Sequence, residues 1–314
     1  MEHFSSAVLE KLFSPNEVVD IIRKGILKYA GGKYRIPERQ HLERGASTNL
    51  IMPAFGTHYF CTKLISVDPL NPLKNLPVIS GILVLNDNLT GQTLVTMDAP
   101  MITALRTAAI GAIGFNLISR QNETKLGIIG LGVQGFWQTI FIASSKNLSE
   151  IYCFSRNKSK FFSYKKKVAK SFPNINIKWC SSAEEVVKNA QIIVACTTSN
   201  DPIFNSEEMN IVEKRFISVG SFTKQMQELP EDVYKQADAL IIDAKSAEKE
   251  VGDVINAIKN HWIETSDIYT LADVLSGQVS VKKYENVAFK SVGMAAFDLA
   301  LAVAAYEKIN MHKN

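Results

Sequence analysis

A glycine-rich turn near the middle of the chain offers the clearest chemistry in the sequence. Residues 130–135 read Gly-Leu-Gly-Val-Gln-Gly, the pattern G-x-G-x-x-G, and they follow an apolar run at 126–129. In a strand–turn–helix unit the first glycine makes the tight turn and the second lets the backbone approach a pyrophosphate. The third allows helix and strand to pack closely. The helix predicted over 136–145 would point its N-terminus at the phosphates. We therefore expect a dinucleotide site; a glycine-rich turn without a ligand is the alternative. The residues of this turn that we assign to the cofactor are Gly130, Gly132, Val133 and Gln134.

The end of the next predicted strand, 150–154, bears on the choice between NAD and NADP. An Asp or Glu at this point would bind the ribose 2′-OH of NAD. The chain continues instead with Ser155, Arg156 and Asn157. A guanidinium and a hydroxyl suit a 2′-phosphate, so we expect NADP, with NAD as the alternative. Most of the lysines from Lys158 onward are expected to form a solvated helix face.

Polar residues follow two further predicted strands. Thr197 and Thr198 come after the strand at 191–195, and Val219 leads into Gly220 and Ser221. Ligands of doubly wound folds lie at the carboxyl ends of the parallel strands. We therefore expect these residues to line the nicotinamide side; ordinary polar loop starts are the alternative.

Two positively charged residues lie in sequence surroundings that suggest a catalytic or binding role. Lys63 lies in the strand-like run 59–65, where a lysine usually points to solvent. In a cleft, desolvation would lower its pKa and suit it to proton transfer. Arg106 lies inside an apolar, alanine-rich helix predicted over 101–119, and a buried arginine needs a partner. It forms either a structural ion pair or an anion clamp beside the cofactor.

The elements that must position these groups fall into two regions. A helix is predicted from Pro15 to about Tyr29, and apolar runs up to residue 97 predict an antiparallel sheet. From residue 125 strands and helices alternate, which predicts a parallel sheet with helices on both faces. The last predicted helix, 294–308, has a composition like that of the helix at 101–119, and we expect the two to pack together.

Composition excludes several classes of function. The 314 residues are 46% hydrophobic and 21% charged with a net charge of +4, which does not argue for nucleic acid or an anionic membrane. We expect no signal peptide and no apolar stretch long enough to cross a bilayer. The spacing of the five histidines suggests no metal site, and the four cysteines are expected to be reduced. A cytoplasmic protein is predicted.

Short motifs spread along most of the chain form a common pattern. They are Met52-Pro53-Ala54, Thr62-Lys63-Leu64, Asp87 to Gly91, Met97-Asp98, Ile102 to Ala109, Gly130 to Gly135, Ser218 to Ser221, Glu250 to Asp253 and Lys290 to Met294. Together these motifs resemble the ornithine cyclodeaminase/mu-crystallin family. The resemblance implies an α/β fold in which a Rossmann domain, 116–292, is inserted into an α+β substrate-binding and dimerisation domain, 1–115 plus 293–314. It also implies a homodimer.

The resemblance assigns roles to the cations. Residues matching Arg39, Lys63 and Arg106 hold the substrate carboxylate and surround the reacting carbon. Arg35 and Arg44 are rivals of Arg39, because the local spacing differs slightly. In this frame Arg106 also belongs to the cofactor site, together with Thr107 and Ser291.

One departure from the family pattern directs the choice of reaction. Ornithine cyclodeaminases place an aspartate for the substrate's side-chain amine soon after the Val-Gly pair, whereas here Phe222 follows Ser221 and the next acid is Glu228. We therefore expect an NAD(P)H-dependent reductase or dehydrogenase of a small imino or amino acid, of ketimine, pyrroline-2-carboxylate or alanine type. The alternatives are an NAD-dependent cyclodeaminase and a non-catalytic, NADPH-dependent binder of a small ligand.

Overall fold

The computed structural model describes residues 2–207 and 209–311, and the chain divides into two compact units. One unit comprises residues 1–106 and 294–314, and the other residues 107–293. We expected the first boundary after residue 115, whereas it falls inside helix α3 (Ala99–Ile118), after Arg106. The expected fold class, mixed α/β with a parallel sheet in the inserted part, is confirmed.

The first unit is built on a six-stranded sheet in the order β1-β6-β5-β4-β3-β2. Neighbouring strands are antiparallel except β1 and β6. Neither β1 nor β2 was expected, because β1 is very short and every residue of β2 is exposed, so neither shows apolar alternation. The strands are β1 (Glu2–Phe4), β2 (Gln40–Arg44), β3 (Ser47–Phe55), β4 (Tyr59–Val67), β5 (Ile79–Asp87) and β6 (Thr93–Asp98).

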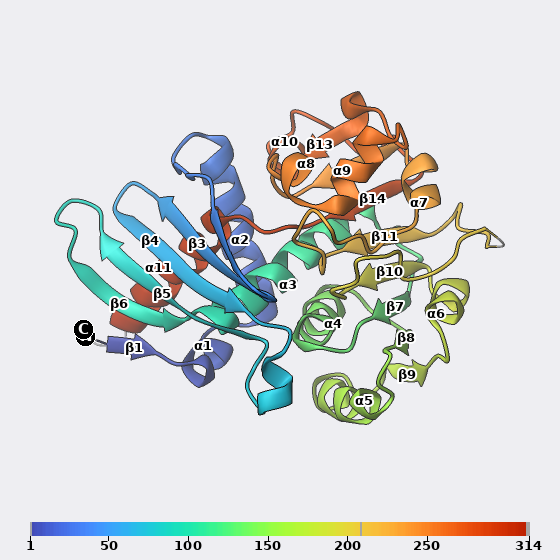
Figure 1. The fold of residues 1–314 in the computed structure, drawn as a ribbon, viewed down its shortest axis with the longest axis horizontal. Coiled ribbons are helices and arrows are strands. Elements are labelled where there is room, and N and C mark those ends of the chain that lie inside the picture. Colours follow the sequence, from blue (N-terminus) through green and yellow to red (C-terminus); the bar gives the residue numbers. More distant parts are fainter. Residues whose placement is uncertain (1, 208, 312–314) are drawn as a thin grey trace. The chain divides into compact units, whose positions relative to one another are not determined.

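Helices cover one face of this sheet. Helix α2 (Pro15–Ala30) begins at the capping box between Ser14 and Glu17, and α11 (Ala295–Met311) lies behind β3 to β5 in Figure 1. We expected α11 to pack on the helix at 101–119, but it packs mainly on α2 and on the sheet. Both α3 and α11 are apolar all round, so their composition does not specify a partner. The unit also contains α1 (Ser6–Leu12) and the 3-10 turn η1 (Asn71–Lys74).

The second unit contains an eight-stranded parallel sheet in the order β13-β12-β14-β11-β10-β7-β8-β9. Figure 1 shows α4 and α5 on one side of it and α6 and α7 on the other. From β7 the chain winds first to β8 and β9 and then back to β10 and β11, so the switch point lies between β7 and β10. The strands are β7 (Lys125–Ile129), β8 (Glu150–Phe154), β9 (Asn176–Trp179), β10 (Ile192–Ala195), β11 (Arg215–Ser218), β12 (Ala239–Ile242), β13 (Ile268–Thr270) and β14 (Val287–Lys290).

Two strands of this sheet differ from expectation. Neither β13 nor β14 was predicted from the sequence, and β14 lies between β11 and β12 in the sheet. Both are short apolar runs without a period that distinguishes strand from helix. The helices are α4 (Val133–Ser145), α5 (Ser159–Ser171), α6 (Ala183–Asn189), α7 (Glu231–Lys235), α8 (Ala247–Glu250), α9 (Gly252–Lys259) and α10 (Leu271–Leu275), with a 3-10 turn η2 (Thr265–Asp267).

Helix α3 corrects one expectation about membranes. We expected no stretch long enough to cross a bilayer, but the 20 residues of α3 are long and apolar enough by length and composition. Of its most apolar window, 78% is buried inside the protein. Such burial is typical of the central helix of a folded domain.

Candidate active site

The glycine-rich turn has the geometry that a pyrophosphate needs. Gly130 has φ +101°, and a Cβ there would lie 2.5 Å from the carbonyl oxygen of Cys196. A Cβ on Gly135 would lie 2.0 Å from the oxygen of Gly130, so the start of α4 packs tightly against the turn. At Gly132 a Cβ would meet nothing within 4 Å, and this residue caps α4 without any side-chain hydrogen bond. The open backbone at the N-terminus of a long helix therefore fits a phosphate group.

The end of β8 lies beside this turn. The backbone N–H of Gly130 donates to the oxygen of Phe154 at 2.9 Å, which joins the turn to the last residue of β8. Arg156 is exposed, and within the described residues neither its guanidinium nor the Ser155 hydroxyl makes a hydrogen bond or ion pair. Asn157 instead accepts hydrogen bonds from the backbone and hydroxyl of Ser159. Arg156 and Ser155 are therefore available to a ligand, whereas the side chain of Asn157 is engaged.

The ends of β10 and β11 are joined by an acid that we did not select from the sequence. Glu228 accepts hydrogen bonds from the backbone and the hydroxyl of Thr197, at 2.6 and 2.9 Å, and from the backbone of Gly220 at 2.7 Å. Thr198 is exposed and Val219 is partly exposed. The side chain of Thr197 is therefore occupied by Glu228, and its neighbours Thr198 and Val219 present the accessible surface.

Two residues assigned to the cofactor are buried. Ser291 donates its hydroxyl to Asp243 at 2.7 Å, and Asp243 also accepts from the backbones of Val292 and Gly293. Thr107 is buried too, and its backbone oxygen accepts a hydrogen bond from Gln138 at 3.0 Å. Both residues fix local chain segments, and their contact with a cofactor stays a prediction.

In the first unit, Lys63 points to the covered face of the sheet. By strand register its direct neighbours are Met52 on β3 and Leu83 on β5, which are buried with it. The side chain of Lys63 is 1% exposed. The usual solvent-facing orientation of a strand lysine does not apply here, because its face of the sheet is the one that α11 covers.

Lys63, Asp298 and Arg106 form a buried charged cluster. The Nζ of Lys63 lies 2.8 Å from Oδ2 of Asp298 and donates to the hydroxyl of Thr103 at 3.2 Å. The Nε of Arg106 lies 3.3 Å from Oδ1 of Asp298. Within the described residues the terminal guanidinium nitrogens of Arg106 make no hydrogen bond, and the Asp298 carboxylate lacks a well-oriented one. The terminal nitrogens of Arg106 are therefore left to donate to a carboxylated ligand.

The cluster changes the acidity of Lys63. Burial is the largest cause and lowers the pKa of Lys63 from 10.5 to about 8. The positive charges of Arg106 and Arg39 act in the same direction, whereas the carboxylate of Asp298 opposes them. A lysine with a pKa near 8 exchanges protons readily at neutral pH, as a general acid or base must.

The surroundings of Arg39 differ from those of the two alternative arginines, Arg35 and Arg44. Its charge acts on Lys63, and its side chain is partly buried. Arg35 is exposed and lies over the ring of Phe55, 4.7 Å from its centroid. Arg44 is exposed at the end of β2. These observations favour Arg39 as the N-terminal cation beside Lys63.

The chain matches known proteins over nearly its whole length. A model of the ornithine cyclodeaminase/mu-crystallin family matches residues 2–313. The chain belongs to this family. It is 28% identical to the Δ1-pyrroline-2-carboxylate reductase of Bacillus cereus, over 95% of the chain and 93% of the relative. It is also 28% identical to the alanine dehydrogenase of Archaeoglobus fulgidus, over 95% of the chain and 92% of the relative.

A solved structure of the family is closely similar. The Thermococcus litoralis Δ1-pyrroline-2-carboxylate reductase, in complex with NADH and L-proline, superposes with a TM-score of 0.93 at 28% identity, and the alignment covers 100% of this chain and 98% of that one. The resemblance deduced from the motifs is thus confirmed.

Asp298 was not among the residues selected from the sequence. It could have been recognised there as an acid in the first turn of the otherwise apolar helix α11.

Proposed function

We propose that this family member is an NAD(P)H-dependent reductase or dehydrogenase of a small imino or amino acid. The observation that carries the proposal is the buried cluster of Lys63, Asp298 and Arg106, in which a lysine of lowered pKa lies beside an arginine with free terminal nitrogens. The open turn at Gly132 supplies the cofactor site. The activities of the relatives in Bacillus and Archaeoglobus support the same class of reaction.

The chemistry assigns a separate task to each group. A reduced nicotinamide, when bound, supplies a hydride to the carbon of the C=N bond. The substrate nitrogen gains one proton, and Lys63 is the group that provides it or polarises the imine. Arg106 and Arg39 hold the substrate carboxylate by charge-assisted hydrogen bonds. Holding the substrate in one orientation supplies a large share of the lowering of the barrier.

Glu228 supports reduction over deamination of a diamino acid. It is the next acid after the Val-Gly pair, but its carboxylate is 0% exposed and accepts hydrogen bonds from Thr197, Ser218, Gly220 and Ser221. A carboxylate saturated in this way does not bind a distal substrate amine. The sequence has no acid between Ser221 and Glu228, which favours a substrate without a second cation.

A substrate screen tests the proposal. Oxidation of NADPH and NADH is followed with pyrroline-2-carboxylate, piperideine-2-carboxylate, and pyruvate or glyoxylate with ammonia or methylamine. We expect turnover of at least one cyclic imine or imine-forming pair. Release of ammonia from ornithine without net consumption of NADPH would identify a cyclodeaminase instead. Tight coenzyme binding with no turnover across the panel would identify a non-catalytic binder.

For the cofactor we propose a preference for NADP over NAD, carried by Arg156. The Arg156→Asp variant should weaken NADPH binding by roughly tenfold to a hundredfold, since hydrogen bonds to charged groups contribute about 1.5–3 kcal/mol. NADH binding should change little. The matched control is Lys160→Asp, an equal charge change on the neighbouring exposed helix face. Fluorescence titration measures both affinities, and an unchanged NADPH-to-NADH ratio in Arg156→Asp would contradict the proposal.

We also propose a homodimer, formed through the uncovered face of the first unit's sheet. By register Ile51, Leu64 and Ile82 form one row across β3, β4 and β5 on the face opposite Lys63. Leu64 is 43% exposed, and Leu42, on the same face at the edge strand β2, is 51% exposed. Exposed apolar rows of this kind are typical of protein interfaces, and a two-fold symmetric dimer pairs one patch with itself.

A charge placed in this row tests the dimer. Leu64→Asp should convert the dimer to a monomer, because two copies would each bury an unpaired carboxylate in a self-paired interface. Light scattering coupled to size-exclusion chromatography gives the mass. Leu89→Asp is the control, since Leu89 is 94% exposed in the loop between β5 and β6. A Leu64→Asp variant that keeps the dimer mass would place the interface elsewhere.

The four cysteines are free, which suits a reducing compartment, and we propose that the protein is cytoplasmic.

A further inference from the structure

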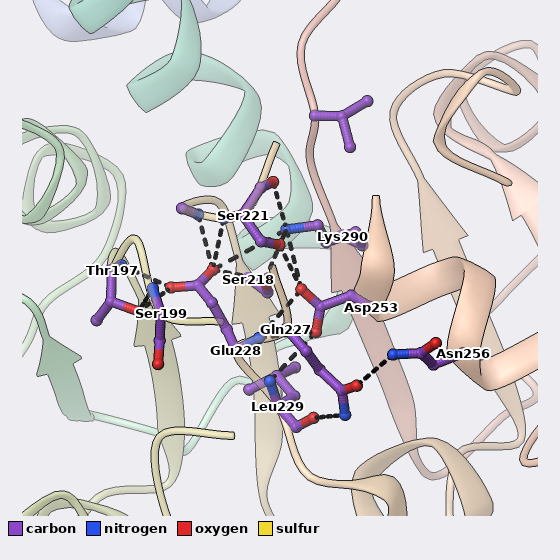
Figure 2. A network of polar contacts seen from close by, with 12 residues as sticks. Thr197, Ser199, Ser218, Ser221, Gln227, Glu228, Leu229, Asp253, Asn256 and Lys290 are labelled. Atoms are coloured by element: carbon purple, nitrogen blue, oxygen red, sulfur yellow. Dashed lines mark hydrogen bonds and ion pairs between the residues drawn. The ribbon is translucent and has the colours of Figure 1, made fainter. Parts of the chain in front are cut away.

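A second buried charge cluster lies at the carboxyl ends of β11 and β14 and at the start of α9. Figure 2 shows Lys290 among Ser218, Ser221, Glu228 and Asp253. Lys290 Nζ lies 3.9 Å from the Glu228 carboxylate and 3.5 Å from that of Asp253. All three charged side chains are at most 1% exposed. The role proposed above for Lys63 and Arg106 does not use this cluster.

The hydrogen bonds of the cluster fit a charged lysine and two charged carboxylates. Lys290 Nζ donates to the hydroxyl of Ser218 and to both the hydroxyl and the backbone oxygen of Ser221, so its three protons have three acceptors. Both carboxylates only accept. Asp253 accepts from the hydroxyls of Ser221 and Tyr234, and burial and the Asp253 charge raise the pKa of Tyr234 well above its usual range. One ammonium and two carboxylates leave one buried negative charge.

The uncompensated charge lies at the carboxyl ends of β10 and β11, and β10 borders the switch point between β7 and β10. Lys290 is closer to Asp253 than to Glu228, and one oxygen of Glu228 is held by Thr197 alone, at the end of β10. The space beside this carboxylate is filled by backbone, since a Cβ on Gly220 would lie 1.9 Å from the oxygen of Thr197. Glu228 therefore fixes the loops after β10 and β11 at the crevice where a dinucleotide binds in this class of fold.

We propose that Glu228 is a positioning residue of the cofactor site that also favours the oxidised over the reduced nicotinamide. This inference rests on the proposed cofactor site. The oxidised ring carries a positive charge and the reduced ring none, so a fixed negative charge beside the crevice stabilises the oxidised form selectively. A buried charge without a partner is costly, and the oxidised ring partly compensates it. The cluster thereby favours hydride donation from the bound coenzyme to the substrate.

The test is the ratio of two affinities measured without substrate. Dissociation constants for NADP+ and NADPH, and for NAD+ and NADH, are measured by calorimetry on the wild-type chain and on Glu228→Gln. A unit charge at about 10 Å, through an effective dielectric constant of about 20, changes an equilibrium by roughly tenfold. Glu228→Gln should therefore lower the preference for the oxidised coenzyme by roughly tenfold. Displacement of the loops alone would weaken both forms equally and leave the ratio unchanged.

A variant with the opposite expected effect on the coenzyme preference keeps the inference testable if Glu228→Gln does not fold. Lys290→Met raises the buried charge from one negative unit to two, so it should increase the preference for the oxidised coenzyme. Ser218→Ala is the control, since it removes one hydrogen bond to Glu228 and one from Lys290 without any change in charge. A ratio within twofold of wild type in the folded charge variants would overturn the inference. A wild-type chain that binds neither coenzyme would overturn the proposed function instead.

Discussion

Replacing Lys63 with alanine should reduce kcat/KM for imine reduction by about 10²–10⁴-fold, the usual contribution of a positioned general acid. Lys63 is the group of the buried cluster whose pKa, about 8, suits proton transfer. Arg106 remains in Lys63→Ala, so coenzyme affinity should stay unchanged and the loss should appear mainly in kcat. Steady-state kinetics with the best substrate from the imine screen measure the change.

The pH dependence gives the same residue a second signature. Reduction needs the protonated amine of Lys63, so kcat/KM for reduction should fall as the pH rises through about 8. Oxidation of the amino acid needs the neutral amine, so its kcat/KM should rise through the same pH. Both breaks should be lost in Lys63→Ala and kept in Lys74→Ala, an exposed control. Full activity in Lys63→Ala would exclude Lys63 from proton transfer. The same conclusion would follow if kcat/KM of this variant still changed near pH 8 as it does in the wild type.

Replacing Asp298 with asparagine should lower the free energy of unfolding at pH 6.5 by about 3–5 kcal/mol, the cost of breaking a buried ion pair from one side. Asp298 is 0% exposed and faces both Lys63 and Arg106, so the variant leaves two buried cations together. Urea denaturation followed by circular dichroism measures the loss. A loss below 1 kcal/mol would mean that the carboxylate does not hold the cations.

The sign of the pH effect separates this cause from a simple packing defect. The pKa of Lys63 is lower in the folded chain than its ordinary value, and the Asp298 carboxylate keeps it from falling further. Without that charge the folded variant loses the Lys63 proton at a lower pH than the folded wild type does. Asp298→Asn should therefore regain stability between pH 6.5 and 9.5, relative to wild type. Asp20→Asn, on the exposed face of α2, should stay within about 0.5 kcal/mol of wild type at both values.

The part of the cofactor site that could be predicted from the sequence is formed by residues close together in the chain. The turn at Gly130, Gly132 and Gly135 combines a strand, a positive φ and a helix start within ten residues, so adjacent residues specify it. The capping box at Ser14 and the alternating strands are local in the same sense. The family resemblance added Lys63 and Arg106 to the set, but it did not show which way Lys63 points.

The tertiary structure alone decided the charge partners. Asp298 reaches Lys63 from the last helix, and Glu228, Asp253 and Lys290 meet from three different elements. A buried charge strongly destabilises the fold unless an oppositely charged side chain lies beside it. Here those partners come from segments distant in the sequence, so no short-range sequence pattern predicts the pairs. The sequence therefore determined the type of fold and the nucleotide turn. Long-range packing decided which face of β4 is covered, and with it the acidity of Lys63.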